Sequence, residues 1–94
     1  MTIRALLHSQ KFKNLLKVYR VKRLALFGSY AEGKAEKRSD VDFLVEFAAE
    51  ADLLDQVGLQ QDLEQFLKKK VDVVTPNSLS KYFRDEVLKK AVYL

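Results

Sequence analysis

Residues 24–47 decide the fold, and they read LALFGSYAEGKAEKRSDVDFLVEF. The first four are a short apolar run that Gly28 stops, which is typical of a buried strand followed by a tight turn. Residues 41–47 alternate, with apolar side chains on one face and both acidic residues, Asp42 and Glu46, on the other. This stretch therefore predicts two strands separated by a glycine turn.

Helices and strands alternate along the rest of the chain. Apolar residues at helical spacing predict two short helices before the first strand, with a break near Ser9. The other expected elements are a first strand from Val21 to Phe27, a helix over 53–69, a short strand over 71–74 and a last helix from about Ser80 to Val92. This order predicts an α/β domain in which helices pack on a small, mixed sheet of three strands.

The composition is that of a folded domain. Ninety-four residues predict a single domain over 1–94, and 48% hydrophobic with 32% charged residues argues against disorder. So short a chain buries a modest core, and a partner or a second copy in a homodimer would add stability. The absence of cysteine excludes disulfides and thiolate metal sites and fits a cytoplasmic protein. No apolar stretch approaches a signal sequence or a membrane span.

The formal net charge of +4 raises the question of an RNA or another anionic partner. The lysines and arginines are spread along the chain instead of forming one block. This distribution favours a solvated surface over direct binding of nucleic acid. His8 is the only histidine and cannot form a histidine-based metal site, so we expect it at the surface.

Gly28 and Ser29 directly follow the first strand. Glycine allows both a tight turn and a close approach of the backbone to a ligand. The N–H groups of such a turn can surround phosphates, and the Ser29 hydroxyl can donate one more hydrogen bond. An ordinary strand-ending turn would use the same residues, so this pair alone does not decide between the two interpretations.

Asp40 and Asp42 are two positions apart, so both carboxylates lie on one face of an extended segment. Like charges this close repel and raise one pKa, and a bound divalent cation removes that cost. Mg²⁺ typically takes one or two carboxylates plus substrate phosphates, and two ions about 3.5–4 Å apart can clamp the reacting oxygens of a phosphoryl transfer. The alternative is that Asp40 caps a turn and Asp42 faces solvent.

Asp72 interrupts the short apolar strand of residues 71–74. A lone aspartate in a buried strand is costly unless it is paired or bound to a metal. If this strand lies next to residues 41–47, Asp72 completes a site of three carboxylates that ligates the ion and accepts the proton of an attacking hydroxyl. An aspartate at a strand edge facing water is the alternative.

Together these residues resemble the minimal nucleotidyltransferase (MNT) family of the DNA polymerase beta superfamily. The spacing of Gly28-Ser29, ten residues and Asp40-x-Asp42 matches the motif of that family residue for residue. The segments that carry the resemblance are LFGSYAEG (26–33), SDVDFLVEF (39–47), KVDVV (70–74) and LKKAVYL (88–94). The resemblance covers essentially the whole chain and implies the palm-like α/β nucleotidyltransferase fold.

The resemblance also implies roles for the candidate residues. Gly28 and Ser29 would hold the triphosphate of ATP. Asp40 and Asp42 would bind Mg²⁺, and Asp72 would be the third acidic residue of the catalytic and metal site. Family members are often antitoxins paired with a HEPN-domain ribonuclease toxin, so the implied reaction is transfer of AMP from ATP to a toxin tyrosine with release of pyrophosphate.

Two alternatives to this reaction stay open. The chain could neutralise its toxin by covering it, with a vestigial acidic site, or it could transfer a nucleotide to a small-molecule acceptor such as an antibiotic hydroxyl. Glu32 gives the first alternative weight, because many family members carry arginine at this position. Lys34, Lys37 or Arg38 in the same loop could supply the missing cation.

Overall fold

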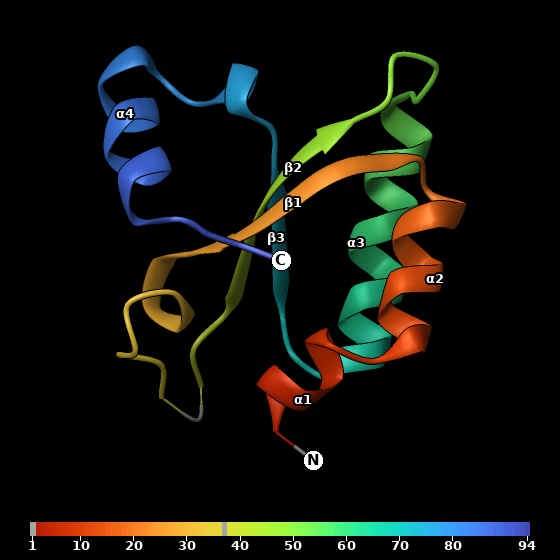
Figure 1. The fold of residues 1–94 in the computed structure, drawn as a ribbon, viewed down its shortest axis with the longest axis horizontal. Coiled ribbons are helices and arrows are strands. Elements are labelled where there is room, and N and C mark those ends of the chain that lie inside the picture. The colour runs from red at the N-terminus through yellow and green to blue at the C-terminus, as the bar shows by residue number, and fades with distance from the viewer. Residues whose placement is uncertain (1, 37) are drawn as a thin grey trace.

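The structure is a computed structural model that describes residues 2–36 and 38–94, and it contains a four-stranded sheet with helices on both faces (Figure 1). The strands are β1 (Val21–Phe27), β2 (Val41–Phe47), β3 (Val71–Val74) and β4 (Val92–Tyr93), in the order β3-β2-β1-β4. The sheet is mixed, as predicted, because β2 runs antiparallel to β1 and parallel to β3. A parallel pair needs a crossover connection, and α3 (Leu53–Leu67) provides it.

The helices divide between the two faces of the sheet. Figure 1 shows α1 (Ile3–Leu7), α2 (Gln10–Val18) and α3 on one side and α4 (Lys81–Lys90) on the other. Each begins at a side chain that accepts a hydrogen bond from a backbone N–H of the first turn. These caps are Thr2, Ser9, Asp52 and Ser80. The Ser9 hydroxyl accepts from the backbone N–H of Phe12 at 3.3 Å, which confirms the predicted break between the first two helices.

The main core lies between the sheet and α1–α3. Its buried members are Leu7, Phe12, Leu24, Leu26, Val41, Phe43, Val45, Leu59, Leu63, Leu67, Val71 and Val73. The members from β2 are three alternate residues, as the sequence pattern predicts. Leu44 belongs to the opposite face but is only 3% exposed, and the short helix η2 (Pro76–Ser78) also contacts β2.

The last residues differ from the prediction of a helix reaching Val92 and a sheet of three strands. The helix ends at Lys90, and Ala91 has an extended backbone with φ −70° and ψ 141°. Val92 and Tyr93 then pair with β1 as the fourth strand. The helical spacing of the apolar residues carries no information about the free edge of β1. Val92 is β-branched and Tyr93 is aromatic, and residues of these types are well suited to pairing with such an edge.

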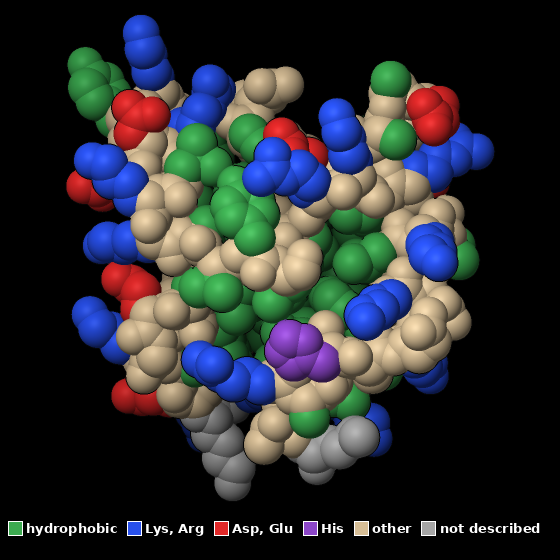
Figure 2. All heavy atoms as spheres, viewed as in Figure 1, with side chains coloured by type: hydrophobic (Ala, Val, Ile, Leu, Met, Phe, Trp, Pro, Cys, Tyr) green, Lys and Arg blue, Asp and Glu red, His purple; other side chains and the backbone are tan. Residues whose placement is uncertain are grey.

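Figure 2 shows the surface of the molecule in the same orientation as Figure 1. Lysine and arginine side chains are spread around the rim of this face, with hydrophobic side chains visible between them. His8 is exposed, as predicted from the sequence. In the described part of the chain, no helix is long and apolar enough to cross a membrane.

Gly58 lies in the middle of α3, where glycine usually costs about 1 kcal/mol relative to alanine. Here the ring of Tyr19, at the end of α2, lies against it. A Cβ at Gly58 would be 2.5 Å from Cε1 of Tyr19. The Tyr19 hydroxyl donates a hydrogen bond to the Asp62 carboxylate, which fixes the ring and raises the pKa of the phenol. Gly58 is therefore the contact at which α2 packs closely on α3.

We expect Gly58→Ala to lower the melting temperature, although alanine at an open helix position would raise it. The added methyl overlaps the Tyr19 ring, and overpacking of this kind costs roughly 1–3 kcal/mol. Thermal unfolding followed by circular dichroism measures the change. In a Tyr19→Ala background the overlap is gone, so the same substitution should then stabilise. A single variant that melts at or above the wild-type temperature would contradict this packing.

Candidate active site

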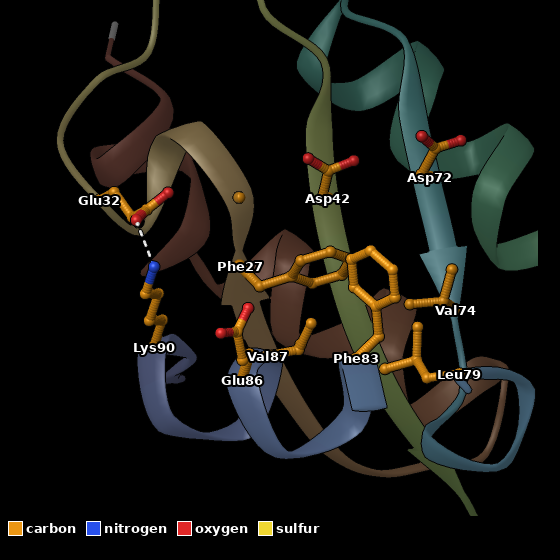
Figure 3. Close-up of a pocket in the computed structure, with 11 residues that line it drawn as sticks. Phe27, Glu32, Asp42, Asp72, Val74, Leu79, Phe83, Glu86, Val87 and Lys90 are labelled. Carbon is orange, nitrogen blue, oxygen red and sulfur yellow. Dashed lines mark ion pairs between the residues drawn. The ribbon is translucent and has the colours of Figure 1, made fainter. Parts of the chain in front are cut away.

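A cleft of about 440 Å³ opens on the face of the sheet that carries α4 (Figure 3). Three residues in register on neighbouring strands line it, namely Phe27 of β1, Asp42 of β2 and Asp72 of β3. The remaining lining residues come from the turn after β1, the end of β3, the segment between η2 and α4, and α4 itself. They are Gly28, Glu32, Val74, Leu79, Phe83, Glu86, Val87 and Lys90.

Asp42 and Asp72 lie side by side because β2 and β3 are parallel and place these two residues opposite one another. Figure 3 shows both carboxylates on the same side of the sheet. The pKa of Asp42 is raised to about 6 by burial, which has the largest effect, together with the charge of Asp72, a hydrogen bond with Asp72 and the charge of Asp40. The raised pKa means that the ionised form of Asp42 is unfavourable without a cation, so a bound cation would stabilise it.

Asp40 lies beside this cleft and does not line it. It precedes the first residue of β2, is exposed, and lines a separate hollow with Arg38, Ser39 and Lys68–Lys70. The described residues contain no group of three or more His, Cys, Asp or Glu side chains that could hold a metal ion. Since Mg²⁺ commonly takes one or two carboxylates and completes its shell with water and phosphate oxygens, the pair Asp42 and Asp72 fits it.

Gly28 ends β1 and begins the short helix η1 (Gly28–Tyr30). Its φ of +72° lies in the left-handed region, and a Cβ at this position would meet the Asp42 carboxylate. Glycine is therefore required twice, for the turn and for the close approach of the backbone to Asp42. The Gly28 carbonyl accepts hydrogen bonds from the N–H groups of Ala31 and Glu32, both at 3.1 Å, which closes the turn.

Ser29 lies next to the cleft in η1 but is not one of its lining residues. It is half-buried, and its carbonyl accepts a hydrogen bond from the N–H of Lys34 at 2.9 Å. The structure thus brings Gly28, Asp42 and Asp72 together at one end of the cleft. It places Ser29 and Asp40 at the border of the same region.

The wall that α4 contributes was missed in the sequence analysis. Phe83 and Val87 are four positions apart on that helix, and both line the cleft. Lys90, at the end of the helix, forms an ion pair with Glu32, with Nζ 3.4 Å from Oε1 (Figure 3). Phe83 is nevertheless 64% exposed, so the apolar spacing marks the side of the helix that lines the cleft and not a buried face. No local pattern reveals which side of the sheet the helix covers.

Asp42→Asn is expected to raise the melting temperature of the metal-free protein at pH 7.5 by a few degrees. The folded-state pKa of Asp42 is about 6 against an ordinary 3.8, so its contribution to stability is greatest below about pH 4 and is lost as the pH rises through 6. Asparagine carries no charge and removes this cost. The gain should shrink as the pH falls to 4, which thermal unfolding in a chelator measures, and equal melting temperatures at pH 7.5 would contradict it.

Comparison with known proteins identifies relatives over nearly the whole chain. The nucleotidyltransferase domain family matches residues 7–94. MJ0435 of Methanocaldococcus jannaschii is 43% identical over 83 residues, which are 88% of this chain and 89% of that protein. The protein adenylyltransferase MntA of Thermococcus cleftensis is 38% identical over 82 residues, 87% of this chain and 83% of the relative.

Solved structures share the fold. A minimal nucleotidyltransferase matches with a TM-score of 0.79 and 35% identity, over 97% of this chain and 87% of the other. A toxin–antitoxin structure with AMP-PNP matches with a TM-score of 0.74 and 29% identity, over 88% and 68%. A tri-AMPylated HEPN toxin in complex with its MNT antitoxin, from Shewanella oneidensis, matches with a TM-score of 0.64 and 27% identity, over 88% and 65%.

These matches confirm both the predicted α/β nucleotidyltransferase fold and the predicted resemblance to the MNT family. They run through the glycine turn, β1, β2, β3 and α4, which are the elements that form the cleft. This chain belongs to the nucleotidyltransferase domain family, as one of its minimal members.

Proposed function

We propose that this protein is a Mg²⁺-dependent protein adenylyltransferase that moves AMP from ATP to a tyrosine hydroxyl of a HEPN-domain toxin and thereby acts as its antitoxin. The observation that carries this proposal is the pair of carboxylates, Asp42 and Asp72, held in register beside the Gly28 turn. The name of the Thermococcus relative and the two toxin–antitoxin structures, one with AMP-PNP and one with an AMPylated HEPN toxin, support it.

The cleft has a polar end and an apolar end, which suit the triphosphate and the adenine base of ATP. Gly28 and Ser29, with the N–H groups of their turn, would hold the triphosphate at the polar end. The apolar end is of the kind that accepts a nucleobase, and its residues are Phe27, Val74, Leu79 and Phe83. A volume of about 440 Å³ lies within the range of about 300–1,000 Å³ that is usual for small-molecule sites.

The carboxylates supply the metal site. Asp42 and Asp72 would hold Mg²⁺ between them and the phosphates, with Asp40 as the third acidic residue at the start of β2. When bound, the ion neutralises phosphate charge and polarises the phosphoryl group under attack. In the transfer, the acceptor oxygen bonds to the α-phosphorus while the bond to the β-phosphate breaks and pyrophosphate leaves. The Asp72 carboxylate, which is exposed, would accept the proton of the acceptor hydroxyl.

The acceptor hydroxyl comes from another molecule. Phe83 and Tyr82 at the start of α4 are 64% and 91% exposed beside the cleft, so a partner protein can reach its edge. A HEPN toxin bound there would present its tyrosine to the α-phosphate. Because the reaction consumes ATP, we place it in the cytoplasm.

Transfer of label from ATP labelled at the α-phosphate, with Mg²⁺, to the HEPN protein encoded beside this gene tests the proposal. We expect label on the toxin, and peptide mass spectrometry should locate AMP on tyrosine. A stable complex without label would favour the alternative that the chain neutralises the toxin by covering it. Label on small hydroxyl compounds but not on the toxin would favour a small-molecule nucleotidyltransferase.

A further inference from the structure

The charge of the cleft is opposite to that of the whole chain. The formal net charge is +4, yet four lining residues are acidic, namely Glu32, Asp42, Asp72 and Glu86. Among the described residues that line the cleft, Lys90 alone is basic. A triphosphate entering this cleft therefore meets an acidic surface, apart from any metal ion and this one ammonium group.

The loop cations considered from the sequence do not fill that role in the structure. Lys34 is exposed and does not line the cleft, and Arg38 lines the separate hollow of Asp40. Lys37 lies outside the described residues. The cation beside Glu32 comes instead from a segment 58 positions later in the chain, the last residue of α4.

The ion pair between Lys90 and Glu32 holds this ammonium group at the border of the Gly28 turn. Figure 3 shows the Lys90 side chain extending from α4 toward the turn, where its Nζ lies 3.4 Å from Oε1 of Glu32. The two side chains are 64% and 33% exposed, and ion pairs with this degree of exposure contribute little to stability. A phosphate oxygen can therefore replace the carboxylate at little cost.

We propose that Lys90 binds the phosphate groups of the nucleotide that leave as pyrophosphate, and that Glu32 holds it at the turn until the nucleotide arrives. This inference rests on the proposed function, since it assigns a further substrate-binding residue to the same site. A lysine ammonium is a compact point charge suited to phosphate oxygens, and the flexible stem allows it to move from Glu32 to the ligand. Glu32 then competes with the nucleotide for Lys90 and also keeps it near.

Binding of three ligands to wild type, Lys90→Met and Glu32→Gln tests the proposal. The ligands are Mg²⁺ with ATP, Mg²⁺ with inorganic tripolyphosphate, and adenosine, each measured by calorimetry without the toxin. We expect Lys90→Met to weaken ATP and tripolyphosphate by about tenfold each and to leave adenosine unchanged, because one charge-assisted contact is lost. Lys89→Met is the matched control, since this neighbour on the same helix does not line the cleft.

Glu32→Gln separates substrate binding from a merely structural tie between α4 and the turn. If Lys90 binds phosphate, removing its competitor leaves tripolyphosphate binding equal to or tighter than in wild type. If the ion pair only fastens the helix, Glu32→Gln and Lys90→Met should weaken binding alike and lower the melting temperature together, which would overturn the proposal. Wild-type binding in Lys90→Met would overturn it too, whereas a wild type that binds neither ATP nor tripolyphosphate would overturn the proposed function itself.

Discussion

Asp42→Asn is expected to lower the rate of AMP transfer by about a thousandfold. Asp42 is the central carboxylate of the cleft, in register with Asp72 on one side and with Phe27 on the other. Removing its charge leaves Asp72 as the only aspartate that lines the cleft, with Asp40 at its border, and metal-ion stabilisation of a phosphoryl transfer is worth several kcal/mol. At about 1.4 kcal/mol for each factor of ten, a loss of three orders of magnitude follows.

The expected stability of the same variant separates loss of activity from loss of folding. Because Asp42→Asn should raise the melting temperature of the metal-free protein, lost transfer cannot be attributed to unfolding. Glu46→Gln is the matched control, since Glu46 follows on the same strand and the same face but pairs with Arg23 away from the cleft. We expect label transfer and toxin binding to be unchanged in that control. Transfer at the wild-type rate by Asp42→Asn would refute the metal site.

Gly28→Ala should reduce transfer by at least about a hundredfold and should lower the melting temperature as well. Alanine at φ +72° costs about 1–2 kcal/mol of backbone strain. The added methyl group also meets the Asp42 carboxylate, so either that side chain or the turn must move. A displacement of about 1 Å in a reacting group can cost about a hundredfold in rate.

Gly33→Ala separates the two causes. Gly33 has nearly the same backbone conformation, with φ +71°, but a Cβ there would meet no atom within 4 Å. Both variants should therefore lose similar stability from strain, while only Gly28→Ala should lose transfer and binding of ATP with Mg²⁺. Equal activity of the two variants would show that the contact with Asp42 does not matter.

Much of the fold follows from the sequence because its main signals are local. The alternation in residues 41–47 and the predicted strand from Val21 to Phe27 correspond to β2 and β1 residue for residue. The predicted end of the last helix at Val92 was wrong, because α4 ends at Lys90. This boundary depends on the free edge of β1, which exists only in the assembled sheet. Glycine inside a helix is locally unfavourable, and only the assembled structure shows that Gly58 allows the close contact with Tyr19 at the end of α2.

The candidate site divides in the same way. The turn at Gly28 and the carboxylates could be chosen from spacing, because a strand fixes which residues share a face. That Asp72 lies opposite Asp42 depends on strand order and register, which the sequence analysis stated only as a condition. The ion pair between Glu32 and Lys90 joins residues that are distant in the chain, and no local sequence pattern predicts such a contact.

The four residues of β3 carry consequences for how this protein can evolve. Val71 and Val73 are buried in the core, and Asp72 between them faces the cleft. A shift of one residue against β2 would turn Asp72 into the apolar core and both valines out of it. Packing of the valines thus maintains the register on which the chemistry depends. Selection for a stable protein and selection for an active one therefore fall on adjacent codons, and an insertion or deletion in this strand would fail both at once.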